Sequence, residues 1–360
     1  MYLKYFGLKE HPFQITPDSD FLFMSEGHAR AMACMDYTIR NRDGFVVITG
    51  EVGCGKTTLI RKLLSEFDER ILVSKIFQTQ LNEVEFLQAI LVEFGLNPFG
   101  GATKVELMDM LTTFLLESFM KNKQLVLIVD EAQNLNARVL EEIRLLSGIE
   151  TDKQKILHVV LVGQPELNDL LDSPEMEQLL QRVRLRFHLK ALSPIEATHY
   201  VVHRLRVAGA PPDVELFLPE TSGVIYEYTG GVPRLINTLC DTALTCAFAD
   251  DLWQVSTTVV RSAIEELQWI PYAARIAKKP KRVARIPSAN GTVQEEHVRG
   301  GSDAELSEHM CNIEALLRNI ESLLQRRNHI SVRLGRHQLR ELVRQLGIGA
   351  NGKIETGVNP

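Results

Sequence analysis

The sequence has few cysteines and no long apolar segment. Its five cysteines include no C-x-x-C pair, which argues against a zinc knuckle or a disulfide framework. The longest purely apolar runs are about five residues, whereas a membrane-spanning helix needs about 20. The N-terminal residues contain no apolar run of signal-peptide length either. We therefore expect a cytoplasmic protein whose thiols are reduced.

The composition is that of an ordinary globular protein. Hydrophobic residues make up 45% of the 360 residues and charged residues 24%, and the length suggests about two domains. The formal net charge of −6 gives no general affinity for polyanions. A basic segment at 275–285 departs from this average and could be a solvated linker, a contact for anionic lipid or a contact for DNA phosphates. Its basic residues are Arg275, Lys278, Lys279, Lys281, Arg282 and Arg285.

Strand-like and helix-like segments alternate over residues 45–192. Short apolar runs that alternate with helical periodicity predict a three-layer α/β core with a five-stranded parallel sheet. From 193 to 270 the periodicity is helical only, which predicts a helical lid after the sheet domain. Residues 1–44 precede the core as a lead-in. The expected strands are 45–49, 71–77, 125–129, 157–162 and 183–189.

The C-terminal quarter differs in character from the rest. Residues 271–303 are basic and contain proline and glycine, which predicts a flexible linker. Between 304 and 348 an apolar stripe with coiled-coil spacing predicts a helix that either pairs with a second copy or packs on the body of the protein. Residues 349–360 are expected to be disordered. The stripe consists of Leu306, Met310, Ile313, Leu317, Ile320 and Leu324.

The most informative motif is the run G-E-V-G-C-G-K-T at 50–57, which lies between an apolar run and a helix-forming stretch. A glycine-rich turn that leads into a helix presents backbone N–H groups and the positive helix end to a phosphate. In such a loop Lys56 would reach the β- and γ-phosphates, and the Thr57 hydroxyl would ligate Mg²⁺. The chain is thus predicted to bind a nucleoside triphosphate through Gly50, Glu51, Val52, Gly53, Cys54, Gly55, Lys56, Thr57 and Thr58.

Two carboxylates follow the apolar run at 125–129. The carboxyl end of a buried parallel strand lies at the same sheet edge as the loop after the first strand. Asp130 is therefore a candidate for holding Mg²⁺, and Glu131 for orienting the attacking water and accepting its proton. The alternative is a strand that simply ends in solvated acids. Beside an intact phosphate loop, two acids in this order favour hydrolysis over transfer to an acceptor.

Polar residues on three later segments could complete a catalytic site. Gln164, after the run at 157–162, could reach the γ-phosphate or the water, or could simply cap its strand. Arg182 could enter a neighbouring subunit's site, either from one face of a strand shared with Arg184 and Arg186 or from a helix end beside the sheet. Arg234 follows the break G-G-V-P, where a helical lid could fold a cation over the γ-phosphate.

These motifs together resemble AAA+ ATPases of the general secretion pathway protein A type, the ExeA-like family. The resemblance covers about residues 1–270, and it implies ATP and Mg²⁺ as ligands and oligomeric assembly coupled to hydrolysis. It also implies Gln164 as the first sensor, Arg234 as the second, and packing of Pro12, Phe13 and Ile15 around the adenine. The runs that carry it are YFGLKEHPF at 5–13, TPD at 16–18, FLF at 21–23, VDEAQ at 129–133, LVGQPEL at 161–167 and GVPRLIN at 231–237.

The sequence departs from this family after the ATPase module. Secretion members of this type resemble one another in a membrane span and an envelope-binding domain, and residues 271–360 are expected to contain neither. The expectation is an oligomeric ATPase motor or switch for secretion or envelope export, with a protein partner in that apparatus and peripheral contact with the inner membrane. The alternative is an ATP-dependent DNA-binding regulator of transposition, which would use the basic segment at 275–285.

Overall fold

The computed structural model describes residues 2–278 except Pro17, 42–43, Gln78, 152–153 and 212–213. The chain divides into two units, Met1–Arg282 and Val283–Pro360, and the description below concerns the first. The expected linker beyond Lys278, the heptad helix at 304–348 and the tail at 349–360 lie outside the described residues.

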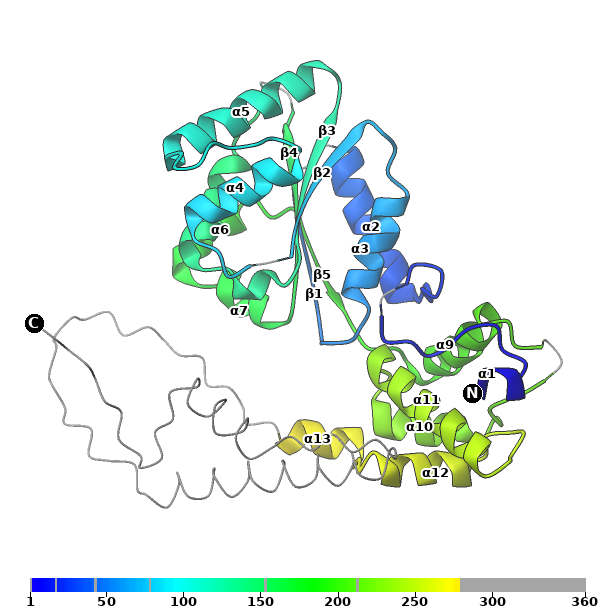
Figure 1. The fold of residues 1–360 in the computed structure, drawn as a ribbon. Coiled ribbons are helices and arrows are strands. Elements are labelled where there is room, and N and C mark those ends of the chain that lie inside the picture. The colour runs from blue at the N-terminus through cyan, green and yellow to red at the C-terminus, as the bar shows by residue number, and fades with distance from the viewer. Residues whose placement is uncertain are drawn as a thin grey trace, which may run out of the picture. The chain divides into compact units, whose positions relative to one another are not determined.

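Within the described residues, five parallel strands form one sheet in the order β2-β3-β4-β1-β5 (Figure 1). This confirms the predicted five-stranded parallel sheet. Strand β4 is buried throughout, and β3 is buried at every residue after Gln124, because helices cover both faces. The strands are β1 (Phe45–Gly50), β2 (Ile71–Ile76), β3 (Gln124–Val129), β4 (Leu157–Gly163) and β5 (Leu185–Leu189).

Alternate residues of each strand face opposite layers. In β1, Val46 and Ile48 belong to the apolar cluster with α2 (Glu26–Arg40) and α3 (Lys56–Ser65). Phe45 and Val47 belong to the cluster on the other face. The helices of that second face are α4 (Glu83–Glu93), α5 (Lys104–Met120), α6 (Ala137–Leu146), α7 (Glu166–Leu171) and α8 (Glu177–Leu180), with the short 3₁₀ turns η1 (Ala132–Asn134) and η2 (Pro174–Met176).

Polar caps define where several helices begin. Asn82, Thr103 and Ser193 each form a capping box with a glutamate three residues later, which satisfies backbone N–H groups at the helix start. Ser25 and Asn136 each accept a hydrogen bond from a backbone N–H of the first turn. These local signals fix where α2, α4, α5, α6 and the helix that follows Ser193 begin.

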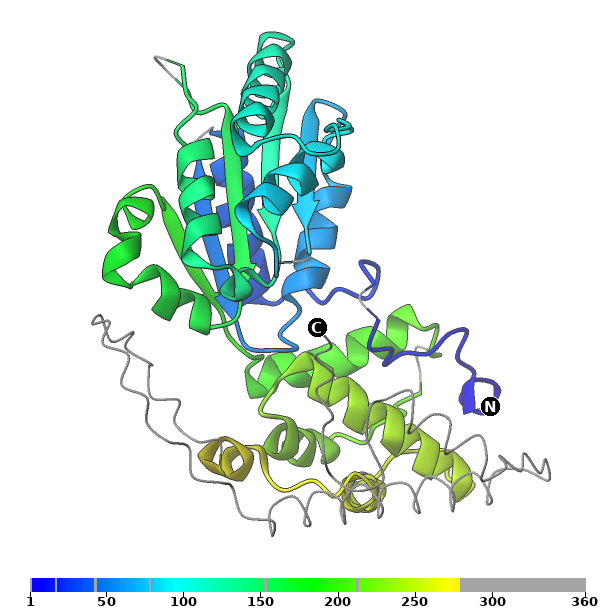
Figure 2. The same cartoon turned by 60° about the vertical axis from the view of Figure 1, so that its left-hand side comes forward.

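A helical lid follows the sheet domain, as expected. Its helices gather at the end of the sheet where β1 leads into α3 (Figures 1 and 2). The lead-in contributes to the lid core, since Tyr2, Phe6 and Phe13 are buried in the same apolar cluster as the lid helices. The elements are α1 (Tyr2–Tyr5), α9 (Pro194–Val207), α10 (Thr221–Thr229), α11 (Pro233–Ala249), α12 (Thr257–Glu266) and α13 (Tyr272–Lys278).

Helix α13 differs from the expected start of a linker at residue 271. The guanidinium of Arg275 lies 4.5 Å from the centre of the Trp269 ring and donates a hydrogen bond to the Tyr228 carbonyl. Because stacking on an aromatic face offsets the loss of water around a guanidinium, a basic residue can belong to a packed helix. Arg275 is therefore part of the lid, whereas the basic residues from Lys279 lie outside the described residues.

Candidate active site

The phosphate loop between β1 and α3 depends on glycine at three positions. Gly53 and Gly55 have φ values of +85° and +92°. A Cβ atom on Gly53 would lie 2.6 Å from the Arg234 Cβ, and one on Gly50 would lie 2.7 Å from the Leu189 carbonyl oxygen. The loop is thus closely packed between β5 and the lid. Its backbone conformation and these close neighbours leave no room for side chains at the three glycines.

Lys56 is held inside the loop that it follows. Only 6% of the residue is exposed, and its Nζ donates to the carbonyls of Gly50 (2.7 Å) and Glu51 (3.0 Å). An ammonium group has three N–H donors. Two of them therefore anchor the side chain, and the third remains to contact an anion in the cavity that Lys56 lines.

Thr57 and Asp130 meet where the phosphate loop reaches the end of β3. The Thr57 hydroxyl donates to Asp130 Oδ2 at 2.9 Å, and Asp130 is 2% exposed. Burial raises the pKa of Asp130, while its hydrogen bonds from Thr57 and the Glu131 backbone N–H act in the opposite direction. A hydroxyl and a carboxylate in contact are the hard oxygen ligands that Mg²⁺ prefers, so the two residues fit the expected ion.

Glu131 has a left-handed backbone conformation, with φ of +54°. Its Oε2 accepts a hydrogen bond from Gln164 Nε2 at 3.0 Å and another from Gln133 Nε2 at 2.6 Å. The structure thus brings together Glu131 and Gln164, which the sequence placed on neighbouring strands. Gln133 was not singled out from the sequence. A non-glycine residue in this backbone region is unusual and is typical of functional sites.

The lid reaches the phosphate loop through the start of α11. The Arg234 backbone N–H donates to the Gly53 carbonyl at 3.2 Å, and the exposed Arg234 side chain lines the same cavity as Lys56. The glycine pair before α11 makes this approach possible, because a Cβ on Gly231 would lie 2.0 Å from the Leu192 carbonyl oxygen. A lid movement would therefore act directly on the loop.

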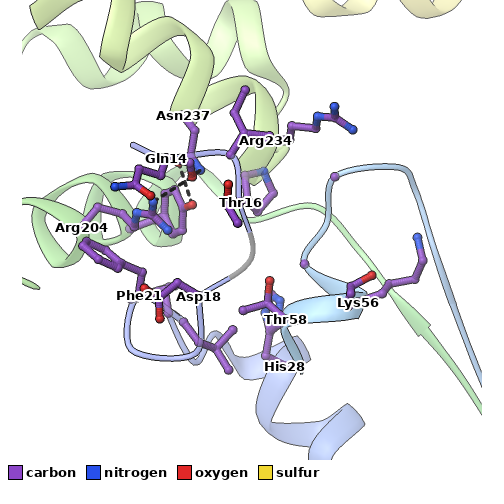
Figure 3. Close-up of a pocket in the computed structure, with 18 of the residues that line it drawn as sticks. Gln14, Thr16, Asp18, Phe21, His28, Lys56, Thr58, Arg204, Arg234 and Asn237 are labelled. Atoms are coloured by element: carbon purple, nitrogen blue, oxygen red, sulfur yellow. Dashed lines mark hydrogen bonds between the residues drawn. The ribbon is translucent and has the colours of Figure 1, made fainter. Parts of the chain in front are cut away.

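Lid, lead-in and phosphate loop enclose one cavity of about 510 Å³, a size typical of small-ligand sites. Figure 3 shows Arg204 and Asn237 on the lid side and His28 and Thr58 on the sheet-domain side, whereas the ends of the Arg234 and Lys56 side chains point away from the other labelled residues. The expected adenine wall is only partly realised. Ile15 is 57% exposed and lines the cavity, whereas Pro12 and Phe13 do not line it. The residues that line the cavity are Gln14, Ile15, Thr16, Asp18, Phe21, Leu22, Phe23, His28, Val52, Gly53, Gly55, Lys56, Thr57, Thr58, Glu131, Leu192, Tyr200, Arg204, Pro233, Arg234 and Asn237.

Comparisons with known proteins agree with this geometry. Residues 39–171 match the family described as AAA domain. Over 249 residues the chain is 43% identical to general secretion pathway protein A of Aeromonas hydrophila, an alignment that covers 69% of this chain and 45% of that protein. This chain belongs to the AAA+ family and is related to general secretion pathway protein A. The resemblance noted in the sequence is thereby confirmed, although the chain matches less than half of that relative's length.

Solved AAA+ structures share the fold. The ORC2 protein of Aeropyrum pernix, in ADPNP and ADP complexes, matches with a TM-score of 0.55 and 21% identity over 72% of each chain. Cdc6p of Pyrobaculum aerophilum matches with a TM-score of 0.56 and 18% identity, covering 71% of this chain and 70% of that one. At these identities the likeness establishes the P-loop α/β architecture alone.

Two lid residues of this AAA+ chain hold the lead-in in place. The buried Arg204 donates from Nε to the Pro12 carbonyl and from Nη2 to the Gln14 carbonyl. Asn237 Nδ2 donates to the same Gln14 carbonyl at 3.2 Å. These contacts hold the segment on the lid, where Phe13 is buried in the apolar cluster of the lid helices. Sequence reasoning missed Arg204 and Asn237, because their partners lie about 190 and 220 residues earlier in the chain.

The three arginines near β5 do not lie together on one strand. Arg182 follows the end of α8 and precedes β5, so the second alternative, a helix end beside the sheet, holds. Its Nη1 donates to the Arg144 carbonyl at 2.6 Å and to the Ser147 hydroxyl at 3.0 Å. Arg186 lies within β5, where it pairs with Asp172 at 2.8 Å. A role for Arg182 in a neighbouring subunit's site remains a proposal.

Cys54 is inaccessible although it lies in the phosphate loop. Its side chain is fully buried, and burial raises the pKa of its thiol to about 11. A thiol in this state is a poor nucleophile near neutral pH. Cys54 therefore acts as a small residue that fills the space behind the loop.

His28 supports the phosphate loop from the start of α2, a role that the sequence did not indicate. Its ring Nε2 lies 3.0 Å from the Cys54 carbonyl oxygen, and Nδ1 lies 2.7 Å from Ser25 Oγ. Because the Cys54 carbonyl can only accept, we assign the ring proton to Nε2, so that Nδ1 of the neutral ring accepts from the Ser25 hydroxyl. Burial lowers the pKa of His28, which keeps the ring neutral in this role.

Replacing His28 by alanine should weaken nucleotide binding about fivefold, because a buried loop carbonyl would lose a hydrogen bond that contributes about 1 kcal/mol. Titration calorimetry with an ATP analogue would measure the change. The matched control is Tyr37→Ala, since Tyr37 is 51% exposed on the same helix and should leave the affinity unchanged. Equal affinity of the His28 variant and the wild type would show that the contact does not support the loop.

Proposed function

We propose that the protein binds ATP with Mg²⁺, hydrolyses it, and uses the cycle as an oligomeric switch or motor in secretion or cell-envelope export. The observation that carries the proposal is the single cavity lined by Lys56, Thr57 and Glu131 from the core and by Arg234 from the lid. A site built from two bodies can couple the chemistry of a bound nucleotide to movement between them.

The phosphate loop and the end of β3 supply the binding groups. The loop N–H groups and the remaining Lys56 donor would hold the β- and γ-phosphates, and Thr57 and Asp130 would hold Mg²⁺. When bound, the ion neutralises charge on the phosphates. Asp130 is buried, so a bound cation would offset the loss of water around its carboxylate.

Glu131 is the proposed general base. Its carboxylate would orient a water molecule toward the γ-phosphate and accept its proton. Gln164, whose amide contacts Glu131 at 3.0 Å, is the proposed sensor of the same phosphate. Arg182 is proposed to act in the nucleotide site of a neighbouring subunit. There it would release its hydrogen bonds to Arg144 and Ser147 and pair with the negatively charged phosphate.

Lid movement is the proposed output of the cycle. The hydrogen bond from Arg234 N–H to the Gly53 carbonyl joins the lid to the loop that contacts the phosphates. A second hydrogen bond runs from the Leu192 N–H to the Gly231 carbonyl at 2.9 Å. It joins the segment between β5 and α9, which connects the core to the lid, to the turn before α11. Closure of Arg234 over the γ-phosphate would favour assembly, and loss of that phosphate would loosen it.

The 43% identity to general secretion pathway protein A supports the choice of pathway. We place the protein on the cytoplasmic side, in peripheral contact with the inner membrane and with a protein of the export apparatus. Among the described residues, no helix is long and apolar enough to cross a bilayer. The DNA-binding alternative depends on the basic segment at 275–285, whose first residue, Arg275, is packed into the lid.

The test combines turnover with export. The purified chain should hydrolyse ATP when Mg²⁺ is present and lose the activity in EDTA, and its mass by light scattering should rise with a non-hydrolysable ATP analogue. Cells that carry Glu131→Gln should lose export of secreted proteins or surface polysaccharide. Normal export together with ATP-dependent binding of duplex DNA would replace this proposal by the DNA-binding one.

A further inference from the structure

Gln133 links the carboxylate of Glu131 to the end of strand β4. Its Nε2 donates to Glu131 Oε2 at 2.6 Å, and its Oε1 accepts from the Gln164 backbone N–H at 2.9 Å. Both ends of one side-chain amide are therefore used. Because an amide satisfied at both ends has a fixed orientation, Gln133 holds Glu131 at a defined place relative to β4.

The space for this amide exists because residue 163 is glycine. A Cβ atom on Gly163 would lie 2.7 Å from Gln133 Oε1, a distance that the amide could relieve only by moving. Gly163 is the last residue of β4, and the same Cβ would lie 3.3 Å from the backbone nitrogen of Gln133, which lies on η1. The strand end and the 3₁₀ turn are thus shaped for the amide to lie between them.

The two amides that contact Glu131 act on the same oxygen atom. Gln133 and Gln164 both donate to Oε2. Oε1 accepts no hydrogen bond from the residues that the structure describes, and Glu131 lines the cavity. One carboxylate oxygen is therefore fixed by the protein, and the other is left to contact water.

We propose that Gln133 is a positioning residue for hydrolysis, which fixes the carboxylate of Glu131 for its contact with water. The inference rests on the proposed ATPase function. It gives Gln133 a role that neither the phosphate loop nor the acidic pair at 130–131 assigns to it. Gln133 does not line the cavity that the nucleotide would occupy. Its loss should therefore reduce the rate of the chemical step and leave nucleotide affinity unchanged.

Replacing Gln133 by methionine tests the hydrogen bonds at nearly constant side-chain volume. We expect kcat to fall about 10- to 100-fold, as for other residues that orient a catalytic group, with the Kd for an ATP analogue unchanged. The matched control is Asn134→Ala, because Asn134 is exposed on the same turn and its variant should keep wild-type turnover. Wild-type kcat in Gln133→Met would overturn the proposal.

A second pair of variants guards against a folding defect. Gly163→Ala should lower kcat as Gln133→Met does, because its methyl group displaces the amide, and the double variant should show no further loss. Adding Gln133→Met to Glu131→Gln should likewise leave the residual turnover unchanged. Independent, additive losses would mean that Gln133 does not act through Glu131.

The outcomes separate this inference from the function on which it rests. A wild-type chain that does not hydrolyse ATP would refute the proposed function. A wild-type chain that hydrolyses ATP, with activity lost in Glu131→Gln but kept in Gln133→Met, would refute the positioning role alone.

Discussion

Replacing Glu131 by glutamine should abolish ATP turnover while ATP binding is kept. An amide has the shape of the carboxylate but cannot accept the proton of the attacking water, and general-base contributions are typically 10²- to 10⁴-fold. The side-chain oxygen of the new glutamine can still accept from Gln133 and Gln164, which contact Glu131 at 2.6 and 3.0 Å. The local geometry should therefore survive, and the effect should fall on kcat.

Steady-state phosphate release and titration calorimetry would measure the two quantities separately. The matched control is Glu117→Gln, because Glu117 is exposed on α5 and the same chemical change there should not affect turnover. Unchanged hydrolysis in Glu131→Gln would remove Glu131 from the catalytic role. A parallel loss of binding would show instead that the carboxylate holds the nucleotide site together.

Replacing Lys56 by alanine should weaken ATP binding itself, by about 10- to 100-fold. The ammonium lies on two loop carbonyls at 2.7 and 3.0 Å and has one donor left for a phosphate oxygen. A hydrogen bond to a charged group contributes about 1.5 to 3 kcal/mol, which corresponds to this range of affinity. The carbonyls of Gly50 and Glu51 would also lose their partner, which should loosen the loop.

Titration of the variant with ATP and Mg²⁺ gives the Kd directly. Lys62→Ala is the matched control, since Lys62 lies on the same helix and pairs at 3.2 Å with Glu66 on the protein surface. It should bind ATP as the wild type does. An unaltered Kd in Lys56→Ala would mean that the glycine-rich loop is not a phosphate site.

Several parts of this architecture could be predicted because their signals are local in the chain. Strands β1, β3 and β4 contain continuous apolar runs, and the phosphate loop is one uninterrupted motif. Thr57 and Asp130, which are in contact, lie 73 residues apart in the sequence. It was still predictable, because parallel strands bring their carboxyl ends to one sheet edge.

Other parts could not be predicted, because their partners meet only through packing. Pro12 and Phe13 were expected beside the base, but hydrogen bonds from Arg204 hold this segment on the lid. Arg275 was assigned to a linker, but aromatic rings of the lid stack on its guanidinium. The deciding hydrogen bonds join residues far apart in the sequence, since Arg204 contacts the Pro12 carbonyl 192 residues earlier and Arg275 contacts the Tyr228 carbonyl 47 residues earlier.

The sequence by itself determined the layer order, the phosphate loop and the acidic strand end, since apolar periodicity and short motifs act over a few neighbouring residues. Only the tertiary structure decided that His28 supports the loop and that Gln133 holds Glu131. Both roles depend on a hydrogen bond between a side chain and another segment, 3.0 Å from His28 Nε2 to the Cys54 carbonyl oxygen and 2.9 Å from the Gln164 backbone N–H to Gln133 Oε1. Such directions are set when helices and strands pack together, because buried polar atoms must then find partners among the groups that the fold brings near.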